Sequence, residues 1–272
     1  MRANGLRLLW AKGGKAVNGW CAIPAPFAAE VMAHQGWDSL VVDMQHGVVG
    51  YESAVAMLQA ISTTDTVPLV RVPWLEPGIV MKMLDAGAMG IVCPMVNTAD
   101  EAKRFAGYCR YPPQGVRSFG PIRATLYAGA DYPEHANAEV LALAMIETEE
   151  ALSNLEAILD VDGLDGVYIG PADLAASLGA KPGFDPTDGR VLEAIGRIVQ
   201  AAKERGRFAC VHTGSPDFAK RMFKDGFDLA TISSDARCMA AKAQEILGEM
   251  KAVDETDDPG LPSSVPEEGD GY

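Results

Sequence analysis

Residues 67–94 read VPLVRVPWLEPGIVMKMLDAGAMGIVCP and have the pattern of a strand, a helix and a second strand. Residues 67–71 and 90–94 are short apolar runs of the kind found in buried strands. Between them, residues 77–86 have the spacing of an amphipathic helix, and Gly87 follows where a left-handed helix cap is expected. The stretch therefore predicts two parallel strands joined by a helix.

The same alternation of short apolar runs and longer amphipathic segments continues along the chain. The predicted strands are residues 19–23, 39–43, 67–71, 90–94, 141–147, 166–170, 207–211 and 228–232. The predicted helices are residues 26–35, 51–61, 77–86, 99–108, 149–159, 189–205, 217–225 and 235–251. This strict alternation predicts an α/β fold, a closed (β/α)8 TIM barrel.

The composition is that of an ordinary globular protein, with 272 residues, 48% hydrophobic and 22% charged. The 37 acidic and 23 basic residues give a net charge of −14, which argues against binding to nucleic acid or to an anionic membrane. No apolar run has the roughly 20 residues of a membrane-spanning helix, and the first residues lack the apolar core of a signal peptide. We therefore expect a cytoplasmic protein.

Two regions depart from the repeating pattern. Residues 111–139 are rich in Gly and Pro and too long for a simple connection, so we expect a functional lid or a subunit contact there. After Lys251 the sequence becomes acidic and almost free of apolar residues. The sequence therefore predicts one barrel domain over residues 1–251 and a disordered acidic tail over residues 252–272.

Reactive groups of such barrels gather at the carboxyl ends of the strands. The polar residues predicted at these ends are Asp43, Gln45 and His46 after the second strand, Arg71 after the third, Glu147 after the fifth and Asp173 after the sixth. Glu147 follows an apolar run, so its carboxylate would be desolvated unless a cation compensates it. Two facing carboxylates, Glu147 and Asp173, suit Mg²⁺ or Mn²⁺. The alternative is that each carboxylate caps the helix that follows it.

His46 lies three residues after Asp43, and such a pair is a candidate general base, although a lone histidine can equally be a surface residue. Arg71 either pairs with Asp43 or receives an anionic oxygen that develops in a reaction, and both can hold at once. The turn 170–173 opens a helix whose backbone N–H groups could receive a substrate carboxylate. Arg123 is a candidate for binding a distal substrate carboxylate, or else an interface or surface charge.

Lysine is absent from all eight predicted strands. An aldolase that forms a Schiff base places a lysine inside the barrel, so the sequence argues against that mechanism.

With these residues identified, the chain resembles the HpcH/HpaI family of class II, metal-dependent pyruvate aldolases, of the 4-hydroxy-2-oxoheptanedioate and 2-keto-3-deoxy-sugar acid aldolase type. The matching blocks are DMQHG at 43–47, VRVP at 70–73, LDAGA at 84–88, PMV at 94–96, YPPQGVR at 111–117, IET at 146–148 and GVYIGPADL at 166–174. They follow the family's order between residues 19 and 248.

The resemblance implies a barrel of the phosphoenolpyruvate/pyruvate type whose last helix swaps between subunits, in a homohexamer built as a trimer of dimers. It implies Glu147 and Asp173 as ligands of Mg²⁺, Mn²⁺ or Co²⁺. The other implied site residues are His46 with Asp43 as the acid–base pair, Arg71 on the keto or enolate oxygen, the backbone at Gly170, Ala172 and Asp173 on the pyruvate carboxylate, and Asp85 in the neighbouring subunit's site. Asp85 could equally be a surface residue at the end of a helix.

The implied reaction is the reversible cleavage of 4-hydroxy-2-oxoacids to an aldehyde and pyruvate, or a close 2-oxoacid such as hydroxypyruvate. The same enolate would allow an oxaloacetate decarboxylase side activity. The chain departs from the family at Gln45, where an acid is frequent, and at Met145, where some members have Gln. One alternative is an acyl-CoA lyase similar to malyl-CoA and citryl-CoA lyases, although no basic cluster for CoA phosphates stands out. Another is a catalytically silent barrel that binds a keto acid, which the intact set of polar residues argues against.

Overall fold

A computed structural model describes residues 1–254 of the chain. The chain divides into two compact units, Met1–Ala236 and Arg237–Tyr272. The predicted acidic tail lies outside the described residues, except for residues 252–254, which end the last helix. Among the described residues, no helix has both the length and the apolar character needed to cross a membrane.

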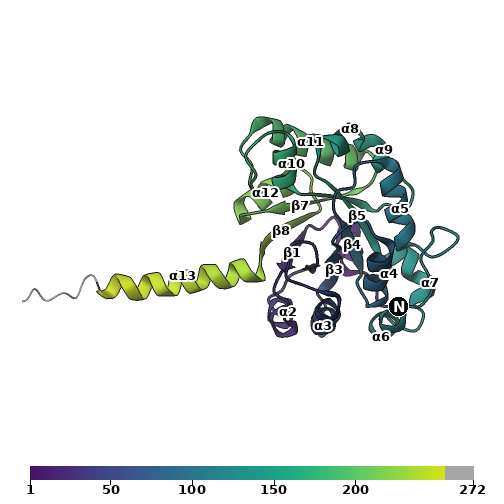
Figure 1. The fold of residues 1–272 in the computed structure, drawn as a ribbon, viewed down its shortest axis with the longest axis horizontal. Coiled ribbons are helices and arrows are strands. Elements are labelled where there is room, and N and C mark those ends of the chain that lie inside the picture. Colours follow the sequence, from purple (N-terminus) through teal and green to yellow (C-terminus); the bar gives the residue numbers. More distant parts are fainter. Residues whose placement is uncertain (255–272) are drawn as a thin grey trace, which may run out of the picture. The chain divides into compact units, whose positions relative to one another are not determined.

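The first unit contains eight parallel strands that pair in sequence order and close into a barrel (Figure 1). The strands are β1 (Ala16–Cys21), β2 (Ser39–Asp43), β3 (Val67–Arg71), β4 (Gly90–Cys93), β5 (Leu141–Ile146), β6 (Gly166–Ile169), β7 (Phe208–Thr213) and β8 (Leu229–Ser234). The predicted (β/α)8 barrel is confirmed. We call the end at which the strands finish the mouth and the end at which they begin the floor.

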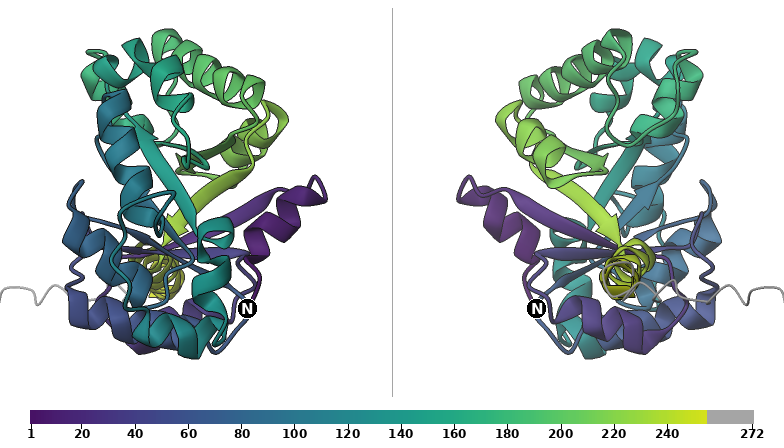
Figure 2. Two further views of the ribbon diagram at one scale, coloured as in Figure 1. Left: turned by 90° about the vertical axis from the view of Figure 1, so that its right-hand side faces the viewer. Right: turned by 90° about the vertical axis from the view of Figure 1, so that its left-hand side faces the viewer.

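Helices lie outside the strands around the barrel, as the two views of Figure 2 show. Those of the first unit that follow the predicted pattern are α2 (Pro26–Ala33), α3 (Tyr51–Ile61), α4 (Pro77–Asp85), α5 (Ala99–Cys109), α8 (Glu149–Ser153), α9 (Leu155–Leu159), α11 (Gly189–Glu204) and α12 (Pro216–Lys224). The last predicted helix is α13 (Asp235–Asp254), most of which belongs to the second unit. The predicted helix 149–159 is thus two helices, divided at Asn154. A further short helix, α10 (Pro171–Ser177), follows β6.

Three helices of the described chain were not predicted from the sequence. The helix α1 (Gly5–Ala11) precedes β1, and its Leu6 and Trp10 pack with the barrel interior at the floor. The helices α6 (Ile122–Ala128) and α7 (Tyr132–Glu139) lie within the segment that was predicted to be a long loop. The Gly and Pro residues of that segment mark its turns, but they do not prevent two short helices between them.

The apolar side chains form two layers. In β5, Leu141, Leu143 and Met145 belong to the cluster inside the barrel, whereas Ala142, Ala144 and Ile146 belong to the layer between strands and helices. Because side chains alternate between the two faces of a strand, the residue after Ile146 points inward again. The fold therefore directs residue 147 into the mouth. By the same alternation, Val41 and Leu69 inside the barrel are followed, two residues later, by the inward positions 43 and 71.

Candidate active site

Asp43, Arg71 and Glu147 are the inward-pointing residues at the mouth ends of β2, β3 and β5. They are 2%, 9% and 2% exposed, so three ionisable groups lie almost out of contact with water. Asp43 and Arg71 are paired residues in the β2–β3 register. The Arg71 Nε and Nη2 atoms donate to the two Asp43 carboxylate oxygens at 2.8 and 2.7 Å. The predicted pairing of Arg71 with Asp43 is therefore observed as a bidentate ion pair.

The Asp43 carboxylate also accepts the backbone N–H groups of Gln45 and His46 at 3.1 and 3.3 Å, and a hydrogen bond from the Trp20 side chain. Burial favours the protonated acid, but the bonds and charge of Arg71, together with those from Trp20 and Gln45, hold the pKa of Asp43 below its usual value. In the part of the chain that the structure describes, Asp43 contacts His46 through its backbone and not through its imidazole. The predicted imidazole–carboxylate contact is wrong, because Arg71 occupies the carboxylate. The His46 side chain lies exposed on the mouth loop.

Glu147 has a different environment. Its Oε1 accepts the backbone N–H of Met95 at 2.8 Å, and Met95 holds a left-handed backbone with φ 55°, which is unusual for a residue other than glycine. A Cβ atom at position 170 would lie 2.3 Å from Glu147 Oε2, so Gly170 leaves the space that this carboxylate fills. Burial, reinforced by the charge of Asp173, raises the pKa of Glu147 to about 7, although the Met95 amide and Arg71 act in the opposite direction.

Asp173 lies in the first turn of α10 and is exposed. The capping alternative is wrong for both carboxylates. The side chain of Thr148 caps α8 by accepting the Ala151 N–H at 3.0 Å, so Glu147 is not needed there. The helix α10 already begins at Pro171, so Asp173 is inside the helix and does not precede it. Neither carboxylate therefore serves as the cap of the helix that follows it.

The two carboxylates fit a divalent cation of the magnesium type. Glu147 is buried, its pKa is raised partly by the negative charge of Asp173, and a cation between them would remove that repulsion. Within the described residues, no group of three or more His, Cys, Asp or Glu side chains could hold a metal ion. Mg²⁺ is commonly bound by one or two carboxylates, with water or substrate oxygens completing its coordination.

Asp85 and Arg123 are not brought to this site within the chain. Asp85 ends α4 and pairs with Arg117 at 2.7 Å, and Arg123 donates to the carbonyl of Ala86 and to Ser62 Oγ. Since α3 and α4 run from the mouth to the floor, their last residues lie near the floor. The guanidinium of Arg123 is occupied by these helix ends, which contradicts a substrate-binding role in its own barrel. A contribution of Asp85 to a neighbouring subunit's site stays a prediction.

A chain of hydrogen bonds crosses the barrel interior below the acidic pair, and the sequence analysis missed it. Ser39 Oγ donates to Asn18 at 2.7 Å, and Asn18 donates to Thr231 Oγ1 at 2.8 Å. Thr231 Oγ1 lies 2.5 Å from the Tyr168 hydroxyl, which lies 3.4 Å from Nδ1 of His212. Burial raises the pKa of Tyr168 well above its usual value, so the phenol is neutral. These residues lie within strands and not at their carboxyl ends, so their position in the sequence does not mark them as site residues.

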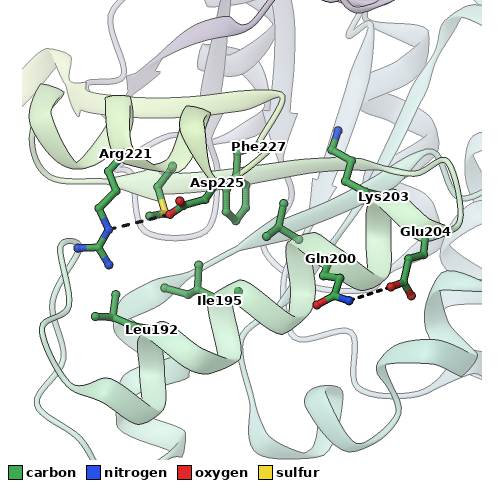
Figure 3. A pocket seen from close by; sticks show the side chains of 11 residues that line it. Leu192, Ile195, Gln200, Lys203, Glu204, Arg221, Asp225 and Phe227 are labelled. Carbon is green, nitrogen blue, oxygen red and sulfur yellow. Dashed lines mark hydrogen bonds and ion pairs between the residues drawn. The ribbon is translucent and has the colours of Figure 1, made fainter.

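A separate groove of about 540 Å³ lies on the outside of the barrel, between α11 and α12 (Figure 3). Its apolar lining includes Ile195, Val199 and Phe227, and its polar lining includes the bonded pairs Gln200–Glu204 and Arg221–Asp225. None of the predicted site residues lines this groove.

Comparisons with known proteins agree with the resemblance seen in the sequence. Residues 19–241 match the family model "HpcH/HpaI aldolase/citrate lyase". A hydroxypyruvate/pyruvate aldolase of Rhizorhabdus wittichii is 40% identical over 250 residues, which are 92% of this chain and 100% of that protein. A 4-hydroxy-2-oxo-heptane-1,7-dioate aldolase of Escherichia coli is 33% identical over 89% of this chain and 93% of its own length.

A solved structure of a family protein from Burkholderia cenocepacia is 31% identical, with a TM-score of 0.83 over 91% of this chain and 98% of that chain. The fold, the order of the motifs and these matches agree. The chain belongs to the HpcH/HpaI aldolase/citrate lyase family.

Proposed function

We propose that the protein is a metal-dependent aldolase that reversibly cleaves 4-hydroxy-2-oxoacids to an aldehyde and pyruvate or hydroxypyruvate. The observation that carries the proposal is the buried acidic group of Glu147, which has Asp173 beside it and the Asp43-bound Arg71 in the same mouth. A buried acid whose pKa is strongly raised is a candidate for a functional site. The relatives named as aldolases over nearly the whole chain favour this reaction over an acyl-CoA lyase or a silent binding protein.

Glu147 and Asp173 would hold the cation, with Mg²⁺, Mn²⁺ and Co²⁺ as the candidates. When bound, such an ion supplies a Lewis acid that polarises the oxygens of a 2-oxoacid and makes the neighbouring C–H and C–C bonds easier to break. The Met95 N–H orients one oxygen of Glu147, and Gly170 leaves room for the other.

Arg71 would bind the keto oxygen of the substrate. Its Nε and one N–H of Nη2 are committed to Asp43, which fixes the plane of the guanidinium and leaves the Nη1 edge for a ligand. Negative charge grows on the keto oxygen as the C–C bond breaks, and a guanidinium held in advance stabilises it. Arg71 therefore acts on the oxygen where charge develops.

The first turn of α10 would hold the substrate carboxylate. The N–H groups of Ala172 and Asp173 belong to the first helical turn, where backbone donors have no partner within the helix. Gly170, directly before this helix, would place its backbone beside the same carboxylate. His46 on the exposed mouth loop would accept the proton of the substrate 4-hydroxyl, directly or through a water molecule.

Exposed apolar side chains support assembly with further copies of the chain. Val116, Phe119, Ile122 and Leu126 lie exposed in and before α6. The helix α13, considered by itself, exposes Met239, Ile246, Leu247 and Met250. Apolar groups of this size on a surface mark interaction sites. We propose a homohexamer, a trimer of dimers with swapped C-terminal helices, in the cytoplasm. Native mass spectrometry of the wild-type protein tests the hexamer.

Pyruvate release from a panel of 4-hydroxy-2-oxoacids tests the activity. Metal-stripped protein is assayed before and after addition of Mg²⁺ or Mn²⁺, together with Glu147→Gln and with Glu149→Gln as the matched control on the exposed start of α8. We expect release that needs metal, is lost in Glu147→Gln and persists in Glu149→Gln. Release that is indifferent to chelation would contradict the proposal.

A further inference from the structure

Trp20 is a buried indole that contacts both partners of the Asp43–Arg71 ion pair. It lies in β1, is 3% exposed and belongs to the cluster inside the barrel. The Arg71 Cζ atom lies over its ring at 4.8 Å from the centroid, a cation–π contact. The Trp20 side chain also hydrogen-bonds to Asp43, and its indole N–H is the only donor it has.

Neighbouring rings and hydrogen bonds hold the indole itself in place. The His212 ring meets it edge-on, with centroids 5.0 Å apart at 83°, and the Tyr168 ring lies 5.8 Å away at 45°. Tyr168 is tied to Thr231 and, through it, to Asn18 on the same strand as Trp20. The indole is therefore held by aromatic neighbours from β6 and β7 as well as by its own strand.

The guanidinium of Arg71 is confined in two directions. Asp43 holds one edge of its plane through two hydrogen bonds, and Trp20 covers one face. A planar group that is held at an edge and on a face cannot turn about its long axis without breaking one of these contacts. The remaining Nη1 edge is thus aimed before any ligand arrives, which is the condition for effective stabilisation of a developing charge.

We propose that Trp20 is a positioning residue for Arg71, and that its ring face and its indole N–H make separate contributions. The proposal rests on the role of Arg71 in the proposed function. The ring face fixes the tilt of the guanidinium, and the N–H fixes the Asp43 carboxylate that holds it. Trp20 itself does not touch the reacting atoms.

Trp10 offers a matched control at the other end of the barrel. It is also a buried indole of the interior cluster, it donates its N–H to the carbonyl of Asp228 at 3.0 Å, and its ring lies 4.1 Å from that of Phe208. A Trp→Phe change at either position removes one buried indole N–H bond and similar volume. Only the change at position 20 touches Arg71.

The test is the exchange of pyruvate methyl protons for solvent deuterium, which NMR monitors. The full-length protein is used with saturating Mg²⁺ and without Mn²⁺, which would broaden the NMR signals. We expect Trp20→Phe to lower the exchange kcat about tenfold and Trp20→Leu about a hundredfold, with a much smaller change in the KM for pyruvate. Trp10→Phe should stay within about twofold of wild type. The affinity for oxalate, which resembles the enolate of pyruvate, should fall more than that for pyruvate in both Trp20 variants.

Two further variants, Arg71→Lys and Glu147→Gln, distinguish a failure of the proposed function from a failure of the role of Trp20. If the wild type does not exchange, or if Arg71→Lys and Glu147→Gln exchange like wild type, the proposed function fails. If those two variants lose exchange while Trp20→Phe and Trp20→Leu keep the wild-type kcat and the wild-type ratio of oxalate to pyruvate affinity, the role of Trp20 alone is overturned. Should Trp20→Leu not fold, Trp20→Phe carries the test, since it keeps an aromatic ring in place.

Discussion

At the floor of the barrel, Asp165 accepts hydrogen bonds from Arg7, Arg110 and the Ala142 N–H, whereas at the mouth Glu147 accepts the Met95 N–H. Both carboxylates are largely buried. The first is fully compensated by two guanidinium groups, and the second has a raised pKa and a second acid beside it. A buried charge that is paired is costly to disrupt, whereas a buried charge without a counter-charge is costly to keep unless a ligand compensates it. The floor is thus built for stability and the mouth for chemistry.

We expect the largest effect on activity from neutralising the mouth carboxylate, Glu147. Glu147→Gln removes the charge but keeps the shape, so we expect aldol cleavage to fall by a factor of about 10³ or more, as for loss of a principal electrostatic element. The metal-free variant should be at least as stable as wild type, because a desolvated acid has been replaced by an amide. Steady-state kinetics and thermal unfolding measure the two effects. A Glu147→Gln variant that stays active but is less stable would show that Glu147 serves the fold and not the chemistry.

The same change at the floor should have the opposite profile. Asp165→Asn leaves Arg7 and Arg110 without a counter-charge, so we expect a loss of about 3–5 kcal/mol in the free energy of unfolding. The kcat of the folded fraction should stay near that of wild type, because these groups lie at the end of the barrel away from Arg71. Urea unfolding, compared with activity at a temperature where the variant is folded, distinguishes the two ends.

The pH dependence of the free energy of unfolding reports on the raised pKa of Glu147. The pKa of Glu147 is raised from 4.5 to about 7, so the folded metal-free protein binds a proton more tightly than the unfolded chain does. Its stabilising effect is complete below the unfolded value and is lost as the pH rises from 4.5 to about 7, by on the order of 3 kcal/mol. Glu147→Gln should abolish that decline in urea unfolding measured across this range. Added Mg²⁺ should reduce it, because metal competes with the proton.

The smallest effect concerns strain at the mouth. Met95 holds a positive φ in order to aim its N–H at Glu147, and glycine adopts that backbone freely. We expect Met95→Gly to be neutral or to raise stability by about 1 kcal/mol. Met81→Gly, in the ordinary helix α4, should instead lower stability by about 1 kcal/mol. Thermal unfolding of both variants checks the sign. Equal destabilisation by the two changes would show that position 95 is unstrained.

Much of the fold could be predicted from sequence, because strands of a parallel barrel are buried on both faces and read as apolar runs. The strand β1 begins at Ala16 and not at residue 19, since the inward-facing Asn18 breaks the apolar run although it is buried and hydrogen-bonded. Likewise β7 continues to Thr213, past the polar His212. Polar residues bonded across the barrel are invisible to a criterion based on hydrophobicity.

The site was predictable where position alone determines it. Asp43, Arg71 and Glu147 follow apolar strands in the right phase, so their place at the mouth follows from the alternation of side chains. Contacts between distant segments were not predictable in this way. The Asp43 carboxylate binds Arg71 and not the His46 imidazole, and Arg123 binds the ends of α3 and α4. No pattern in the local sequence indicates either contact. Trp20 and Met95 act through such contacts as well.

The most direct test of the account is the binding of Mn²⁺ itself, measured by electron paramagnetic resonance of the free ion in titrations of metal-stripped protein. We expect one ion per chain for the wild type and for the control Glu149→Gln. Binding should be lost in Glu147→Gln and weakened in Asp173→Asn, whereas Asp217→Asn, the equivalent acid in the first turn of α12, should bind like wild type. Equal binding by wild type and Glu147→Gln would contradict the claim that the acidic pair at the mouth holds a cation.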